Sequence, residues 1–197
     1  MGNEQGKPNG KLGVSAVATV CTIQDLHVVQ MVKYFRSLAK GDLIKREDLN
    51  NIMEKLEDIE NVDKELLSSM FTMFDVKGDN NIPYKEFLAG VCLLITGSEK
   101  DKLSLALSVT DTKNTGNMSR TDLRKTLTAM KNVVSYFGDP VVRDVELNMI
   151  VTELFKRQPS SSSTIPYKDN FDSILEHNIT QSFLLGKGKA RFGKGVE

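Results

Sequence analysis

Apolar residues recur along the chain at the spacing of a helical face, and the clearest run surrounds a polar segment. Between Leu67 and Phe74 they stand at positions i, i+3, i+4 and i+7, the stripe of an amphipathic helix. The same spacing returns between Phe87 and Leu94. The twelve residues between these helices, Asp75–Glu86, open with Asp and close with Glu. A helix, a loop of this kind and a second helix form the EF-hand pattern, so the stretch predicts an EF-hand.

The same rhythm occurs three more times. An apolar residue marks the centre of each loop, and these residues are Ile44, Ile82, Met118 and Ile165. The segments NNIPYKEF and STIPYKDNF resemble each other, which supports the alignment of the last unit. Each unit exposes an apolar face that it cannot bury alone. The pattern therefore predicts an all-α fold of four EF-hand-like helix–loop–helix units, paired into two lobes.

The helical rhythm also sets the expected domain limits. The N-terminal pair is expected over residues 22–98 and the C-terminal pair over 99–185. Residues 1–21 and 186–197 are rich in glycine and polar or basic residues, so we expect a flexible N-terminal arm and a flexible basic tail. The first periodic helix is expected to start at Thr22, with Asp25 completing a capping box.

The second loop carries the best candidate ligands for a metal ion. Asp75, Asp79, the Asn81 carbonyl and Glu86 stand at ligand positions of an EF-hand, and Glu at the last position can give two oxygens. Lys77 stands where the regular pattern has an oxygen ligand, so calcium binding here is expected to be weak. The alternative is a loop held by hydrogen bonds, with the Lys77 ammonium near the carboxylates in the cation's place. The Asn80 that replaces the usual glycine is a milder change, since Asn tolerates the left-handed turn.

The other loops are poorer. The third loop, Asp111–Asp122, has full length but offers only Asp111, Thr115 and Asp122 as ligands, and Lys113 repeats the lysine of the second loop. The first loop is contracted and the last is longer, without an acidic ligand, so neither is expected to bind calcium. No cofactor is firmly predicted beyond weak Ca²⁺ at the second loop.

Composition narrows the function classes. The 26 basic and 26 acidic residues give a net charge of zero, which offers no reason to expect nucleic acid as a partner. No apolar run approaches the length of a membrane span. Cys21 and Cys92 form no metal-binding pattern, and reduced thiols in the cytosol are expected. His27 and His177 stand alone, and no catalytic motif is present, so the chain is not expected to be an enzyme.

The N-terminal sequence suggests a route to membrane attachment. Gly2 follows the initiator Met and is a candidate for N-myristoylation, although Gly6 stands where the usual motif has Ser or Thr. One acyl chain gives only marginal attachment, so membrane contact would depend on this modification. A plain flexible arm is the alternative.

The run from Phe71 to Leu123, with its FD, EF and GSEKDKL elements, resembles the group of EF-hand proteins that contains calcineurin B, the neuronal calcium sensors and calaxin. The long connection after the third unit is most similar to calaxin, an axonemal calcium sensor, and the MGN start to the neuronal sensors. The resemblance implies calcium sensing and protein targets, which the lysines at Lys77 and Lys113 put in question.

Two functions remain from the sequence. The first is a non-catalytic adaptor that binds an amphipathic helix of a larger complex without needing calcium, in the cytoplasm or at the cilium or axoneme. The second is a calcium sensor that uses the second loop, and to a lesser degree the third, with a tether at Gly2. In either case the target would lie in an apolar groove expected from Met53, Met70, Met73, Phe87, Leu93, Leu94, Met130 and Met149.

Overall fold

The computed structural model describes residues 13–38, 41–138, 142–159 and 162–184. Its helices and strands, in chain order, are α1 (Val14–Val20), α2 (Asp25–Leu38), β1 (Leu43–Lys45), α3 (Arg46–Met53), α4 (Asn61–Phe74), β2 (Asn81–Pro83), α5 (Tyr84–Val91), α6 (Glu99–Thr110), β3 (Asn117–Ser119), α7 (Arg120–Tyr136), α8 (Asp144–Lys156), β4 (Thr164–Pro166), α9 (Phe171–Leu175) and α10 (Asn178–Leu184). Gly2, most of the predicted arm and the predicted tail lie outside the described residues.

The predicted pairing of the units is confirmed. Strand β1 pairs antiparallel with β2, and β3 with β4. Ile44 faces Ile82 in the first pair, and Met118 faces Ile165 in the second. The apolar loop centres picked from the sequence are therefore direct cross-strand partners, and all four are at most 2% exposed. Within the described residues, four helix–loop–helix units form two lobes.

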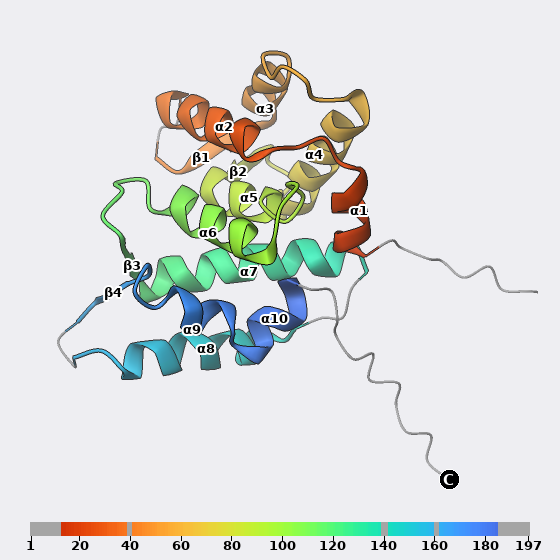
Figure 1. The fold of residues 1–197 in the computed structure, drawn as a ribbon. Helices are drawn as coiled ribbons and strands as arrows, with labels where there is room; N and C mark the ends of the chain where they lie inside the picture. Colours follow the sequence, from red (N-terminus) through yellow and green to blue (C-terminus); the bar gives the residue numbers. More distant parts are fainter. Residues whose placement is uncertain (1–12, 39–40, 139–141, 160–161, 185–197) are drawn as a thin grey trace, which may run out of the picture.

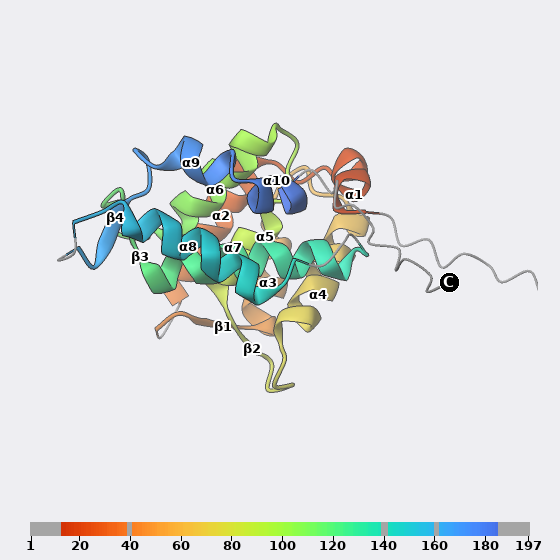
Figure 2. The ribbon, with the colours of Figure 1, turned by 90° about the horizontal axis from the view of Figure 1, so that it is seen from below.

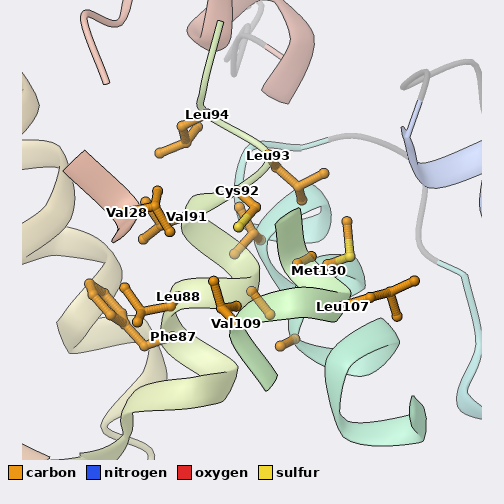
Figure 3. Close-up of a cluster of buried hydrophobic side chains, with 14 of the residues drawn as sticks. Val28, Phe87, Leu88, Val91, Cys92, Leu93, Leu94, Leu107, Val109 and Met130 are labelled. Atoms are coloured by element: carbon orange, nitrogen blue, oxygen red, sulfur yellow. The ribbon is translucent and has the colours of Figure 1, made fainter. Parts of the chain in front are cut away.

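The two lobes share one core. Helix α7 crosses the molecule, with α5 and α6 on one side and α8, α9 and α10 on the other (Figure 1). In Figure 3, side chains of α5 and of the segment after it lie between Val28 of α2 and Met130 of α7. That connecting segment, Cys92–Ile95, is at most 2% exposed. The lobes are therefore joined through packed apolar side chains and not through an exposed linker.

Helices α5 and α7 approach each other most closely at Gly90. A Cβ atom at this position would lie 2.7 Å from Cγ2 of Val133 and 3.1 Å from Cζ of Phe74. Glycine is needed here because any side chain would push the two helices apart.

The start of the chain differs from the prediction. Residues 14–20 form helix α1, with Val14 and Ala18 buried, so the part of the arm next to the first lobe is helical and packed. Thr22 does not cap α2. Its backbone N–H donates to Oδ2 of the buried Asp63 at 3.0 Å, and its hydroxyl donates to the same oxygen. The predicted capping box is therefore wrong, because a partner 41 residues away in α4 takes both donors.

Helix α2 begins with the help of His27. Its Nδ1 accepts the Gln24 N–H at 3.1 Å, and its Nε2 donates to the Glu57 carbonyl at 2.9 Å. This buried ring therefore joins the start of α2 to the connection between α3 and α4. His177 of the last unit lies 3.5 Å from the Glu153 carboxylate.

Candidate functional site

The second loop keeps its turn through its own hydrogen bonds. The Asp75 carboxylate accepts the N–H of Asp79 at 3.1 Å and the N–H of Asn80 at 3.0 Å. The Asp79 carboxylate accepts the N–H of Asn81 at 3.0 Å. Asn80 adopts a φ of 56°, so it fills the left-handed position that usually carries glycine. The loop thus has the EF-hand path without requiring a cation to hold it.

Glu86, the last residue of this loop, is engaged elsewhere. Its carboxylate forms an ion pair with Lys125 of α7 at 3.3 Å, and only 18% of its side chain is exposed. Lys77 forms no ion pair within the described residues, so its ammonium does not stand in for the cation. The structure brings Asp75, Asp79 and Asn81 together, and it places Glu86 between the lobes against Lys125.

The third loop is closed more completely. Asp111 accepts the Thr115 N–H at 3.0 Å, the Thr115 hydroxyl at 3.2 Å and the Gly116 N–H at 2.7 Å. A fourth donor is the Tyr167 hydroxyl, 3.3 Å from Oδ2. Asp122 instead accepts the Ser119 hydroxyl at 2.7 Å, at the start of α7. Asp111 and Thr115 therefore lie together, while Asp122 is turned to the helix N-terminus.

Tyr167 comes from the fourth unit and is not among the site residues predicted from the sequence. It follows strand β4, and its N–H donates to the Gly116 carbonyl at 3.1 Å, which aims its ring into the third loop. Burial, and then the neighbouring Asp111 carboxylate, raise the pKa of Tyr167 above its ordinary value. The IPYK repeat was visible in the sequence, but nothing there indicated that its tyrosine reaches the preceding loop.

These contacts decide how well the loops fit calcium. In the part of the chain that the structure describes, no group of three or more His, Cys, Asp or Glu side chains is close enough to hold a metal ion. The third loop fits poorly, because protein donors surround Asp111 and the Asp122 carboxylate accepts the hydroxyl of Ser119, the N-cap of α7. The second loop fits in part: Asp75 and Asp79 could serve, but Glu86 would have to leave Lys125.

The predicted apolar groove is not open in this conformation. Six of its members are at most 7% exposed: Met53, Met70, Phe87, Leu93, Leu94 and Met130. Met73 is partly buried, and Met149 on α8 is 53% exposed. The helical stripes are used to pack the units against one another, so these side chains do not share a surface here.

The two cysteines are also part of the core. Both are buried and unpaired. Burial is the main reason that the pKa of the Cys21 thiol rises to about 12, and burial raises the pKa of Cys92 as well. Neither thiol has the lowered pKa of a reactive cysteine.

Comparisons with known proteins give two partial matches, both from Dictyostelium discoideum. The calcium-binding protein NCSA is 25% identical over 108 residues, covering 54% of this chain and 56% of that protein. A recoverin family protein is 24% identical over 139 residues, covering 62% of each. These matches support the EF-hand superfamily that includes the neuronal calcium sensors.

This EF-hand chain spans about three fifths of the length of those two relatives. No protein-family model matches it. Neither relative is named as calaxin, as calcineurin B or as an enzyme, so the finer resemblance to calaxin and calcineurin B stays a prediction. Among the described residues, none of the helices has the length and apolar character needed to cross a membrane.

Proposed function

We propose that this chain is a non-catalytic EF-hand adaptor that binds an amphipathic helix of a larger protein and keeps its shape without calcium. One observation carries the proposal: Asp111, the first ligand position of the third loop, is surrounded by four protein donors, one of them Tyr167 of the neighbouring unit. A loop closed in this way gains little from a cation.

The lobe pairs, 22–98 and 99–185, would act together on the target, since they share a continuous core. The resemblance to calaxin suggests an axonemal or other cytoskeletal complex as the setting. In this proposal the loops are structural elements, and the partner supplies the regulation.

A calcium sensor is the second candidate. The second loop keeps its length, Asp75 and a terminal Glu86, and the relatives are named for calcium binding and for recoverin. Calcium would have to draw Glu86 away from Lys125 and tolerate Lys77 beside the site. A tether at Gly2 would belong to this alternative.

Calorimetric titration of the purified full chain with calcium separates the two. The adaptor predicts no binding tighter than about 10 μM, the weak end of the range for sensors. Binding tighter than that, abolished by Asp75→Asn and unaffected by Asp111→Asn, would overturn the adaptor and establish the sensor with its site in the second loop.

A further inference from the structure

A cleft of about 520 Å³ lies between the two lobes, beside the end of the third loop. Its floor is the exposed face of α7, and its walls come from the end of α4, the start of α5 and one face of α8. The partly buried ring of Phe74 lines it, with Ala129 and Val151, each 2% exposed, beneath. In Figure 2, α7 runs between α10 on one side and β2 on the other.

The cleft continues along α7. A second hollow of about 360 Å³ shares Phe74 and Asn132 with the first and is lined at its far end by Met73, Val76 and Tyr136. Val76 is 91% exposed, which is unusual for an apolar side chain of this size. From Arg120 to Tyr136, α7 is about 24 Å long at 1.5 Å per residue. An opening of this length and shape suits an extended or helical peptide better than a small molecule.

The charge in the cleft is concentrated at one end. Arg120, Arg124 and Lys125 line it there, and the only carboxylate in its lining is that of Glu86, which is paired with Lys125. Arg120 and Arg124 form no ion pair with any residue that the structure describes. The guanidinium of Arg120 is held 4.5 Å above the ring of Phe155.

The charge of Arg124 acts on Asp144 of α8, but this carboxylate is bonded to a lysine. The Asp144 carboxylate accepts Lys131 Nζ at 2.6 Å, and this hydrogen bond is the main reason that its pKa is lowered. The guanidinium groups of Arg120 and Arg124 thus line the cleft without an ion pair to a described carboxylate. Guanidinium groups in such positions recognise carboxylates with two parallel hydrogen bonds.

We propose that this cleft, defined by α7 and its neighbours on α4, α5 and α8, binds an amphipathic helix with acidic residues at one end. The acidic end lies at Arg120 and Arg124, and the apolar face begins on Phe74. The remaining apolar turns reach Val76 and Tyr136. A helix whose C-terminus lies at the arginines gains further, because its macrodipole is negative there.

This proposal rests on the proposed function and deepens it, because it gives the partner's chemistry and its place. It differs from the expected Met- and Phe-lined groove in one respect. The cleft is open while Met70, Phe87 and Met130 stay buried, so binding needs no opening of the lobes.

The test uses two labelled helical peptides of about 16 residues, enough to follow the 24 Å of α7 at 1.5 Å per residue. Both carry the same apolar stripe, and the polar end carries Glu in one and Lys in the other. Fluorescence anisotropy with the full chain, in calcium chelator, gives the two dissociation constants. We expect the Glu peptide to bind about tenfold more tightly or better, since like charges are rejected at such a surface.

Three variants locate the binding. Arg124→Glu should remove the preference for the Glu peptide or reverse it. Lys33→Glu makes the same change of charge on the exposed face of α2 and should leave both affinities unchanged. Thr128→Trp fills the cleft and should weaken both peptides. Unchanged thermal unfolding is required of each variant, so that a loss of binding is not a loss of fold.

The titrations are repeated with calcium, and the proposal is overturned if neither peptide binds in either condition, if both bind equally, or if Thr128→Trp leaves the Glu peptide's affinity unchanged. If the Glu peptide binds in the cleft only when calcium is present, the cleft stands and the calcium-independent adaptor fails. The failure of the cleft alone leaves the calorimetric test of the adaptor untouched.

Discussion

The second and third loops have the same length and the same lysine at the third position, yet their candidate ligands are engaged by the protein in different ways. In the second loop, Asp75 accepts two backbone N–H groups, and Glu86 is held by one lysine from the other lobe. In the third loop, Asp111 accepts four donors, and Asp122 is bonded to Ser119.

The two loops differ in how many protein groups would have to move before a cation could bind. In the second loop, the ion pair with Lys125 keeps Glu86 from the other candidate ligands. The Lys125 side chain is 58% exposed, and exposed ion pairs contribute little stability. In the third loop, the Tyr167 hydroxyl of the neighbouring unit also donates to Asp111. Restoring a metal site should therefore be far easier in the second loop than in the third.

Rebuilding the ligands should give the largest difference between the loops. Lys77→Asp with Asn80→Gly and Lys125→Ala supplies an oxygen at the third position, restores the glycine and frees Glu86. We expect calcium affinity in the sensor range, about 10⁻⁷ to 10⁻⁵ M. In the third loop, the matched set Lys113→Asp, Thr115→Asp and Asp122→Glu leaves Tyr167 on Asp111. It should bind at least about tenfold more weakly in calorimetry, because Asp111 must first exchange its protein donor.

The control is the second-loop set without Lys125→Ala, which should bind calcium more weakly than the full set. Equal affinities in the two rebuilt loops would show that Tyr167 does not compete with the cation. The comparison between the loops would then lose its basis.

Removing the first carboxylate of each loop should have a smaller effect, on stability. Asp111→Ala leaves the N–H groups of Thr115 and Gly116 and the Tyr167 hydroxyl without their acceptor and should cost about 2 kcal/mol of unfolding free energy, while Asp75→Ala should cost about 1 kcal/mol. Urea unfolding measures both. Asp79→Ala is a control within the second loop, since it removes only the acceptor of the Asn81 N–H. A cost for Asp75→Ala equal to that for Asp111→Ala would contradict the difference in their hydrogen bonding.

Tyr167→Phe isolates the contribution of the neighbouring unit and should have the smallest effect at neutral pH, about 1 kcal/mol for one hydrogen bond. Its signature is in alkali. Because the folded protein raises the pKa of Tyr167, its contribution to stability is complete below the ordinary value of 10.0 and is lost as pH rises through the higher folded value. The variant should therefore lose less stability than the parent between neutral pH and strong alkali.

Burial also raises the pKa of Tyr84, so Tyr167→Phe should keep part of the alkaline loss and Tyr84→Phe provides the comparison. Unfolding followed by circular dichroism over this range measures it. The same alkaline loss in Tyr167→Phe and parent would mean that the hydroxyl contributes nothing to the third loop.

Periodicity was enough to predict the architecture, because it records which face of each helix is buried. Ile44 and Ile82, or Met118 and Ile165, could be paired from spacing alone, since an EF-hand pair fixes their register. The same information cannot say what covers a buried face. Met70 and Met130 have the composition of a target groove, but they pack inside this molecule.

The site residues that were missed all depend on partners distant in the chain. Lys125 reaches Glu86 across the lobes, Tyr167 reaches Asp111 over 56 residues, and Thr22 is drawn to Asp63 instead of capping its own helix. Local patterns such as a capping box compete with these contacts, and nothing in the spacing of one segment tells which contact is made. The cleft on α7 has the same origin, since it exists only where two lobes meet.

The close packing at Gly90 bears on how the two lobes can move relative to each other. Because the backbone at Gly90 lies against Val133 and Phe74, and because Cys92–Ile95 is enclosed, bending at this junction would expose apolar side chains to water. The two lobes are therefore expected to move together. An adaptor with this junction would present both lobes to its partner in one fixed arrangement.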